Sequence, residues 1–204
     1  MENPKVFKNI GVSIKPYPCC KLTHGAIEGV MALLSEHQLK EGKIADVRIG
    51  VNQSAYSLCA RQPWSEPQSV VEAQFNIPYA AALAICKQSV KLGDFTEKAI
   101  KDKAVMKMAS KVRVSLDEGL CSSSLQVAPT IAEIRDVQGN IYKKEVTRVK
   151  GNPQNPLSWD QLCEKFFSSV EFANISRGRL GELPDKIWKM EKADNIVPLI
   201  QYLT

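Results

Sequence analysis

Residues 130–149 read TIAEIRDVQGNIYKKEVTRV and carry the clearest evidence of the fold class. Two segments rich in β-branched residues, 130–136 and 141–149, flank the turn sequence Gln138-Gly139-Asn140. This pattern predicts an antiparallel β-hairpin. Elsewhere the chain lacks the regular alternation of strands and helices that is typical of a parallel α/β sheet. The sequence therefore predicts an α+β fold, with a mixed or antiparallel sheet that is packed by helices.

The elements upstream of the hairpin follow from hydrophobic periodicity. Apolar residues recur every three or four positions over 27–34, which predicts a helix with one buried face. Over 47–51 they alternate with polar or small residues, as in a half-buried strand. Residues 80–86 are apolar on all sides, which predicts a buried helix, and Asn76 can cap its start. The intervening residues 52–67 are expected to form a polar loop.

A proline-rich turn, GNPQNP at residues 151–156, divides the chain. Directly after it, Ser158 and Gln161 stand in the S-x-x-Q spacing of a capping box, which marks the start of a helix. We therefore predict an α+β domain over residues 1–157 and a C-terminal helical segment over residues 158–204.

Composition excludes several classes of protein. The 204 residues carry 27 Lys+Arg against 22 Asp+Glu, and this mild excess of +5 suits a small anion as well as a nucleic acid. The basic run 87–113 contains Phe95 as its one aromatic residue, so we predict a solvated helix face and no nucleic-acid partner. Neither a membrane-length apolar stretch nor a signal pattern is present, and the six cysteines have no metal-binding spacing. We expect a cytoplasmic protein with reduced thiols, no metal and no membrane partner.

Residues 15–24, KPYPCCKLTH, are the most informative for function. The two prolines stiffen the chain before a helix, and the start of a helix presents unpaired N–H groups with a partial positive charge. Lys15, Lys21 and His24 surround this helix start, which suits a carboxylate or a phosphate. The alternative is a stiff surface corner with a solvated lysine and a packed histidine. The spacing alone favours that alternative.

Two other residue types could carry chemistry. Tyr79 lies in the first turn of the buried helix that Asn76 can cap, where its hydroxyl could act as an acid or could donate a hydrogen bond to an anion. More commonly, such a tyrosine is a core aromatic residue whose hydroxyl is bonded to the backbone. Cys19 and Cys20 could be nucleophiles near a helix start. No Asp or Asn is placed to orient His24 as their base, so we do not predict nucleophilic catalysis.

Four motifs occur in a characteristic order: KPYPCC…H at 15–24 followed by Ile27, VEAQFNIPYAAAL at 71–83, KGNPQNPLS at 150–158, and Lys165-Phe166 in the capped helix. In this order they resemble the MmgE/PrpD family, which includes 2-methylcitrate dehydratase, cis-aconitate decarboxylase and iminodisuccinate epimerase. The resemblance covers nearly the whole chain. Asn76 departs from it, because the family usually has Ser at that position.

The resemblance implies a fold and an activity. Family members combine a large helical domain with a smaller α+β lid, and the active site lies in the cleft between them. This sequence resembles the lid and the C-terminal helical segment, in a lyase that acts on di- or tricarboxylic acids in the manner of 2-methylcitrate dehydratase. The resemblance implies that Lys15 binds a substrate carboxylate and that Tyr79 donates a hydrogen bond or proton. It also places His24 among the catalytic candidates, with its role open, and it implies no cofactor.

The same resemblance implies partners. The family's helical domain supplies further site residues and does not match any part of this chain, so we expect inactivity in isolation and a helical domain or partner chain as complement. Trp188 and residues 196–203 are the expected contact surface, and they predict homodimerisation or poor solubility when uncovered. Two alternatives remain open: an epimerase or isomerase of the same family, and a non-catalytic module that binds anions or subunits.

Overall fold

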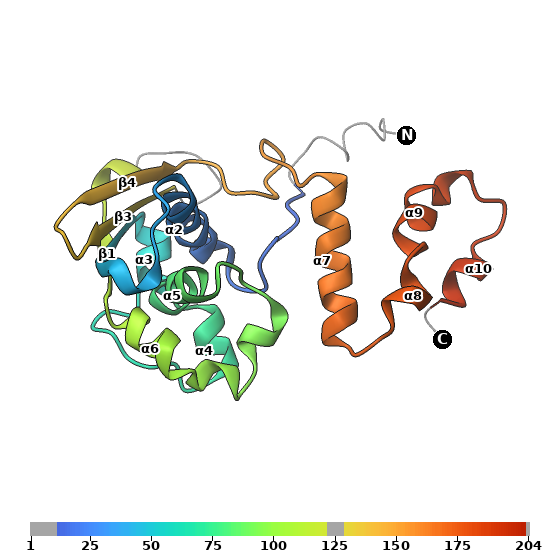
Figure 1. Ribbon diagram of the computed structural model, residues 1–204. Coiled ribbons are helices and arrows are strands. Elements are labelled where there is room, and N and C mark those ends of the chain that lie inside the picture. The colour runs from blue at the N-terminus through green and yellow to red at the C-terminus, as the bar shows by residue number, and fades with distance from the viewer. Residues whose placement is uncertain (1–11, 122–128, 203–204) are drawn as a thin grey trace. The chain divides into compact units, whose positions relative to one another are not determined.

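The computed structural model describes residues 12–121 and 129–202, and the chain divides into two compact units between Pro156 and Leu157 (Figure 1). The helices of the first unit are α2 (His24–Glu36), α3 (Gln53–Cys59), α4 (Val70–Gln74), α5 (Ile77–Lys87) and α6 (Lys103–Ala109). Its strands are β1 (Ile44–Val51), β2 (Val112–Leu116), β3 (Thr130–Asp136) and β4 (Ile141–Val146). The helices of the second unit are α7 (Trp159–Phe172), α8 (Arg177–Leu180), α9 (Leu183–Trp188) and α10 (Val197–Ile200).

The strands form one mixed sheet in the order β2-β1-β3-β4. The predicted hairpin is confirmed: β3 and β4 pair antiparallel, with Thr130 opposite Val146. β1 pairs antiparallel with β3 and parallel with β2. The parallel pair requires a long crossover, and the chain between β1 and β2 supplies it through α3, α4, α5 and α6. The predicted α+β class with a mixed sheet is therefore confirmed.

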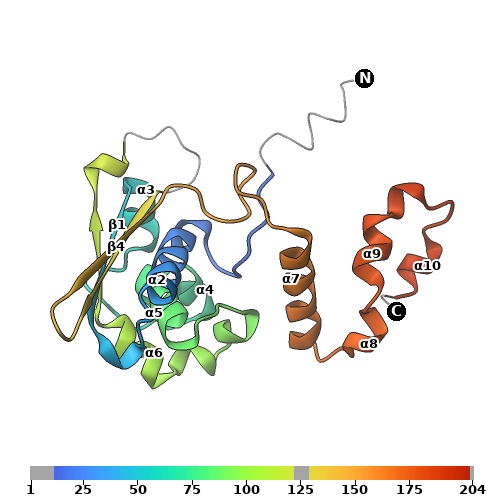
Figure 2. The same cartoon turned by 45° about the horizontal axis from the view of Figure 1, so that its top comes forward.

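Helices cover one face of this sheet. Figure 2 shows α2 and α5 on the same side of the strands, and both helices pack on the sheet. The buried side chains of neighbouring strands align on that side, because Val47 stands opposite both Val112 and Ile134 in the register. On the other face Asp46, Arg48 and their neighbours are polar. The sheet thus has the one-sided burial that antiparallel sheets allow.

The helix α2 approaches the sheet closely at Gly29. A Cβ atom added there would lie 2.6 Å from the Cβ of Ala132 on β3, which is shorter than any normal carbon–carbon contact. The predicted periodicity over 27–34 is confirmed, since Ile27, Val30 and Leu34 are buried and Met31 is half-buried. Two small residues therefore bring the helix backbone against the strand, and the apolar side chains around them fill the interface.

The prediction of a loop over 52–67 is wrong in its first half, where α3 forms. The side chain of Asn52 caps this helix by accepting a hydrogen bond from the Ala55 amide at 3.1 Å. Only Ala55 and Cys59, four positions apart, are buried. Because this short helix buries only two small residues, most of its sequence is polar, and its hydrophobic periodicity is too weak to predict a helix.

The second unit begins at the predicted capping box. Ser158 Oγ accepts a hydrogen bond from the Gln161 amide at 3.2 Å, and Gln161 Oε1 accepts one from the Ser158 amide at 3.0 Å. Buried apolar residues are few in this unit, namely Val170, Leu180 and Leu183. Large apolar side chains of the same unit are exposed: Phe172, Ile175, Ile187, Trp188, Met190, Ile196, Val197 and Ile200.

Among the described residues, no helix is both long and apolar enough to cross a membrane.

The close approach at Gly29 generates a stability prediction. We expect Gly29→Ala to lower the free energy of unfolding by about 1–3 kcal/mol, because the added methyl group meets a Cβ that is fixed to the backbone of a central strand. Urea denaturation followed by circular dichroism measures this change. The control is Gly42→Ala, where the added methyl group meets no atom within 4 Å. Equal stability of the two variants would contradict the packing described here.

Candidate functional site

The corner that precedes α2 is held from one side by the end of α4. Residues 16–19 bend, and a short 3-10 helix, η1 (Lys21–Thr23), leads into α2. Gln74, the last residue of α4, makes two hydrogen bonds to the corner. Its side-chain Nε2 donates to the Pro18 carbonyl at 2.9 Å, and its backbone carbonyl accepts from the Cys20 amide at 2.9 Å. Thr23 Oγ1 donates to the Cys20 carbonyl at 2.9 Å. These bonds give the corner one defined backbone path.

From the other side, the turn after β4 holds the corner. The Ile14 amide donates to the Gly151 carbonyl at 2.9 Å. Gly151 has a φ of +77°, and a Cβ at that position would lie 1.8 Å from the Ile14 carbonyl oxygen, so only glycine fits. Lys21 Nζ also donates to Ser13 Oγ at 2.6 Å. The 150–158 motif is therefore hydrogen-bonded to Ile14, the residue directly before the 15–24 motif.

Cations gather at this corner. Lys15 is exposed, whereas Lys21 is partly buried, and burial together with the charge of Lys15 lowers the pKa of Lys21. The charges of both lysines also act on His24. Because like charges repel one another, a bound anion at this place relieves an existing electrostatic strain. The corner thus has the electrostatic character that the sequence predicts for an anion site.

His24 is the first residue of α2 and its side chain is fully buried. Burial lowers its pKa to about 4; the backbone of Cys19 acts in the opposite direction, and the charges of Lys15 and Lys21 lower the pKa by smaller amounts. Its ring contacts the Tyr17 ring edge-on, with 5.1 Å between the centroids. Within the described part of the chain, neither ring nitrogen makes a hydrogen bond of good geometry. His24 is therefore a neutral imidazole at physiological pH, and its hydrogen-bonding capacity is not fully used in this structure.

Tyr79 lies in the first turn of α5, whose start is capped as expected: Asn76 Oδ1 accepts from the Tyr79 amide at 2.9 Å. The tyrosine is fully buried, and its hydroxyl donates to the Asp94 carbonyl at 2.8 Å. Its ring contacts Phe95 edge-on at 5.8 Å between centroids. Burial, followed by the charges of Asp94 and Asp102, raises the pKa of Tyr79. The hydroxyl is therefore protonated and already engaged in this structure.

The structure brings two of the three predicted site residues together. Lys15 and His24 belong to the same corner, and the charge of one affects the pKa of the other. Tyr79 lies on a helix that packs against α2. Its ring and hydroxyl contact the 92–95 segment, and no bond or ring contact described between residues 12–121 and 129–202 joins it to Lys15 or His24.

Two buried thiols, those of Cys19 and Cys59, do not have the properties of nucleophiles. Cys19 is buried, its Sγ lies 3.1 Å from Thr23 Oγ1, and burial raises its pKa to about 12. Burial likewise raises the pKa of Cys59 to about 12. Thiols of this kind stay protonated near pH 7, and the thiolate is the reactive form.

One residue of functional interest is missing from the sequence-based candidates. Glu28 lies one helical turn after His24, and its Oε1 accepts a hydrogen bond from the Lys150 amide at 2.8 Å. Burial raises the pKa of Glu28 to about 7, although that hydrogen bond and the charge of Lys150 lower it. Glu28 and Tyr17 line a pocket of about 450 Å³ beside Arg148 and Lys150. The available signal was the i, i+4 spacing from His24, which places both residues on one side of α2.

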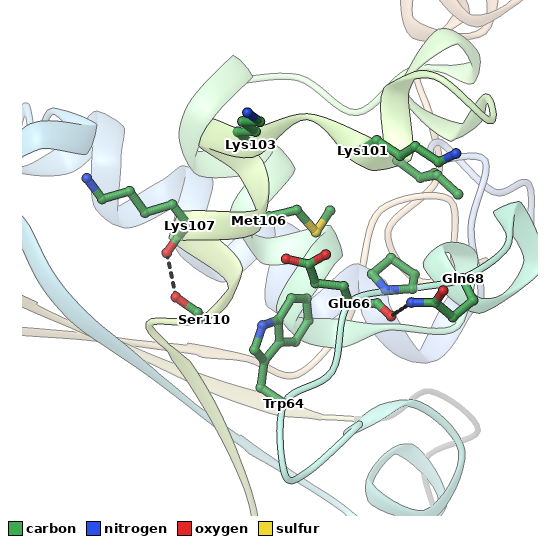
Figure 3. Close-up of a pocket in the computed structure, with 10 residues that line it drawn as sticks. Trp64, Glu66, Gln68, Lys101, Lys103, Met106, Lys107 and Ser110 are labelled. Carbon is green, nitrogen blue, oxygen red and sulfur yellow. Dashed lines mark hydrogen bonds between the residues drawn. The ribbon is translucent and has the colours of Figure 1, made fainter.

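A second pocket, of about 640 Å³, contains none of the predicted site residues. It is lined by Trp64, Glu66, Met106 and three lysines, among other residues. In Figure 3 the amino groups of Lys101, Lys103 and Lys107 point to different sides, and Glu66 lies near the middle. These cations do not converge on one point, so the pocket lacks the geometry of an anion site.

A metal centre is not formed by the described residues. In the ranges 12–121 and 129–202, no group of three or more His, Cys, Asp or Glu side chains is close enough to hold a metal ion.

Comparison with known proteins matches the chain to one family. The family model for the MmgE/PrpD C-terminal domain matches residues 17–178. Two curated sequences of cis-aconitate decarboxylase, both from Aspergillus terreus and one of them from strain NIH 2624 / FGSC A1156, are each 22% identical over 199 residues. Each match covers 94% of this chain, which spans 40% of the length of those relatives. The matched region contains residues 17–24 of the corner, α2, α5 and the 150–156 turn, whereas Lys15 lies two residues before it. The chain therefore belongs to the MmgE/PrpD family through its C-terminal domain.

Proposed function

We propose that this chain is the lid of a lyase that acts on di- or tricarboxylic acids, and that its corner binds a carboxylate of the substrate. The carrying observation is the pair Lys15 and Lys21 beside the neutral imidazole of His24. The relatives are named for the decarboxylation of cis-aconitate, a tricarboxylate. This name supports a di- or tricarboxylic acid as the substrate class. It does not decide between decarboxylation and dehydration, the reaction of 2-methylcitrate dehydratase, so the proposal includes both lyase reactions.

The chemistry of such a lyase matches the charges at the corner. Removal of a proton from the carbon next to a carboxylate, or loss of CO₂ from that position, develops negative charge on an already anionic substrate. A fixed cation at that carboxylate stabilises the transition state more than the bound substrate. In the proposal Lys15 supplies this charge, and closing of the lid removes water and strengthens the interaction.

His24 and Tyr79 have different requirements in this proposal. A neutral imidazole can accept a proton, and the low pKa of His24 keeps its lone pair available at pH 7. Tyr79 can donate from its protonated hydroxyl only if it exchanges its bond to the Asp94 carbonyl for one to the substrate. We therefore propose that Tyr79 takes part when substrate and the rest of the enzyme complete the cleft.

The remainder of the site is proposed to come from a helical domain or a partner chain. The exposed apolar residues of the second unit, with Trp188 at 68% exposure, are the proposed surface for that helical part. The relatives are long enough to contain such a part, since this chain spans 40% of their length. Leu203, which belongs to the expected contact surface, lies outside the described residues.

The carboxylate site predicts citrate binding at the corner. We expect citrate to shift the backbone NMR signals of residues 13–24 in a saturable titration, and we expect Lys15→Ala to weaken the binding at least tenfold, because it removes the exposed cation. The matched control is Lys40→Ala, an exposed lysine beyond the far end of α2. Equal loss in both variants would refute a specific site.

The same preparation tests the need for a helical half. With 2-methylcitrate or cis-aconitate added, we expect the chain alone to leave the substrate unchanged in the NMR spectrum. Turnover that Lys15→Ala abolishes would show that the lid forms a complete site, and the proposed partner would then be wrong.

The uncovered apolar surface predicts self-association. We expect sedimentation velocity to show dimers or larger species whose fraction rises with concentration, and we expect Trp188→Ser to reduce that fraction, because Trp188 is the most exposed tryptophan of the surface. A monomer at millimolar concentration would contradict this surface.

His24 predicts a defined pH dependence of stability. Its pKa is lower in the folded chain than in the unfolded one, so the folded state binds fewer protons between about pH 4 and pH 6.5. We expect His24 to destabilise the protein by about 3 kcal/mol as pH falls through that window, with the effect absent above it. The imidazole NMR signal of His24 should titrate near pH 4, and His37→Gln identifies it by removing the other histidine. A titration near pH 6.5 would refute the burial argument.

A further inference from the structure

Glu28 lies at the start of a chain of contacts that leads to the proposed substrate lysine. Its Oε1 accepts from the Lys150 amide at 2.8 Å. The next residue, Gly151, accepts through its carbonyl from the Ile14 amide at 2.9 Å. Ile14 directly precedes Lys15. One hydrogen bond to the Glu28 side chain and one between backbone groups therefore connect a carboxylate on α2 with the segment that carries the lysine.

The element between the two bonds is rigid. The Gly151 amide donates to the Asn155 carbonyl at 2.8 Å, and the Asn155 amide donates to the Asn152 carbonyl at 2.8 Å. Asn155 Nδ2 donates in addition to the Arg148 carbonyl at 2.9 Å. With its backbone closed on itself in this way, the 148–155 turn moves as one piece. A change at Lys150 is thus transmitted to Gly151.

Gly151 packs so closely against the corner that no side chain could be accommodated at this position. The position of a missing Cβ at Gly151 would lie 1.8 Å from the Ile14 oxygen and 3.3 Å from Pro16 Cδ. Residues 14 and 16 flank Lys15 on both sides. The turn therefore lies so close to the residues on both sides of the lysine that no side chain fits at position 151. Both views of the fold show the 12–18 segment beside this loop (Figures 1 and 2).

We propose that Glu28 is a positioning residue for Lys15 and acts through the 148–155 turn. This rests on the proposed function, in which Lys15 binds a substrate carboxylate. Glu28 does not touch the substrate in this proposal; it fixes the turn, and the turn fixes the backbone on either side of the lysine. The Lys15 backbone is then fixed before the substrate binds, so less conformational entropy is lost when the lysine binds the substrate carboxylate.

The charge state of Glu28 couples this positioning to pH. The hydrogen bond from Lys150 favours ionised Glu28, and by reciprocity ionisation of Glu28 strengthens that bond. Burial works in the other direction and brings the pKa to about 7. Glu28 is also close to titratable or charged groups from the N-terminal segment, its own helix, β4 and the turn: Tyr17, His24, Lys144, Glu145, Arg148 and Lys150. Of these groups, Lys150 supports ionisation of Glu28 through both its amide and its charge.

Hydrogen exchange tests the proposal without any need for turnover. Protection factors of the Ile14 and Lys150 amides report the two bonds directly, and citrate affinity reports the lysine. At pH 8 we expect Glu28→Ala to lower the protection of both amides about tenfold or more and to weaken citrate binding several-fold. We expect Glu28→Gln to restore part of both, because its neutral amide oxygen can still accept from Lys150 but binds more weakly than a carboxylate.

The matched control and the pH profile separate positioning from general destabilisation. Glu145→Ala removes the other carboxylate of the same pocket and should leave the Ile14 amide protected. In the wild type, protection of Lys150 and Ile14 should fall as pH decreases through about 7 toward the level of Glu28→Gln, because protonated Glu28 and Gln are both neutral, weaker acceptors. In Glu28→Gln it should stay constant with pH. This profile remains measurable even if Glu28→Ala does not fold. Protection of the Ile134 amide in the central strand β3 reports whether each variant is intact.

The outcomes distinguish the inference from the function on which it rests. If Ile14 keeps its protection in Glu28→Ala, or if Glu145→Ala has the same effect, the positioning role is wrong. If wild-type protein binds no citrate while Ile14 protection still depends on Glu28, the carboxylate site is wrong and the coupling between α2 and the corner stands.

Discussion

The close packing of α2 on the sheet is the constraint on which the rest of the first unit depends. Gly29 and Ala132 allow the helix backbone to lie against β3. This contact fixes the axis of a helix whose first turns carry His24 and Glu28. A larger residue at either position would move the helix outward. The positions of His24 and Glu28 therefore depend on the packing of Gly29 against Ala132, two residues without reactive side chains.

Burial, more than direct pairing, controls the chemistry of the corner. It lowers the pKa of His24 to about 4, so the imidazole is neutral near pH 7, and it raises the pKa of Glu28 to about 7, so that carboxyl group changes its charge near neutral pH. Lys15 alone remains exposed among the residues singled out for the site. The corner thus combines one accessible cation with a buried neutral imidazole, and this combination suits the carboxylate binding that we propose.

Several features were predictable because they depend on neighbours in the sequence. The hairpin, the α2 periodicity, the Asn76 cap and the Ser158–Gln161 capping box are local, and all four are confirmed. Helix α3 was missed because it buries only two small residues. The roles of Lys15, His24 and Tyr79 came from the family resemblance, which the family match supports, and they stay predictions.

The sequence by itself determined the fold class, the order of the main elements and the family, because periodicity, caps and ordered motifs are written along the chain. Only the tertiary structure decided which groups meet. It joined Glu28 to Lys150 over 122 residues and Gly151 to Ile14 over a similar span, and it turned the Tyr79 hydroxyl toward Asp94. Such contacts depend on how helices pack on the sheet, and the sequence around each partner contains no local signal for them.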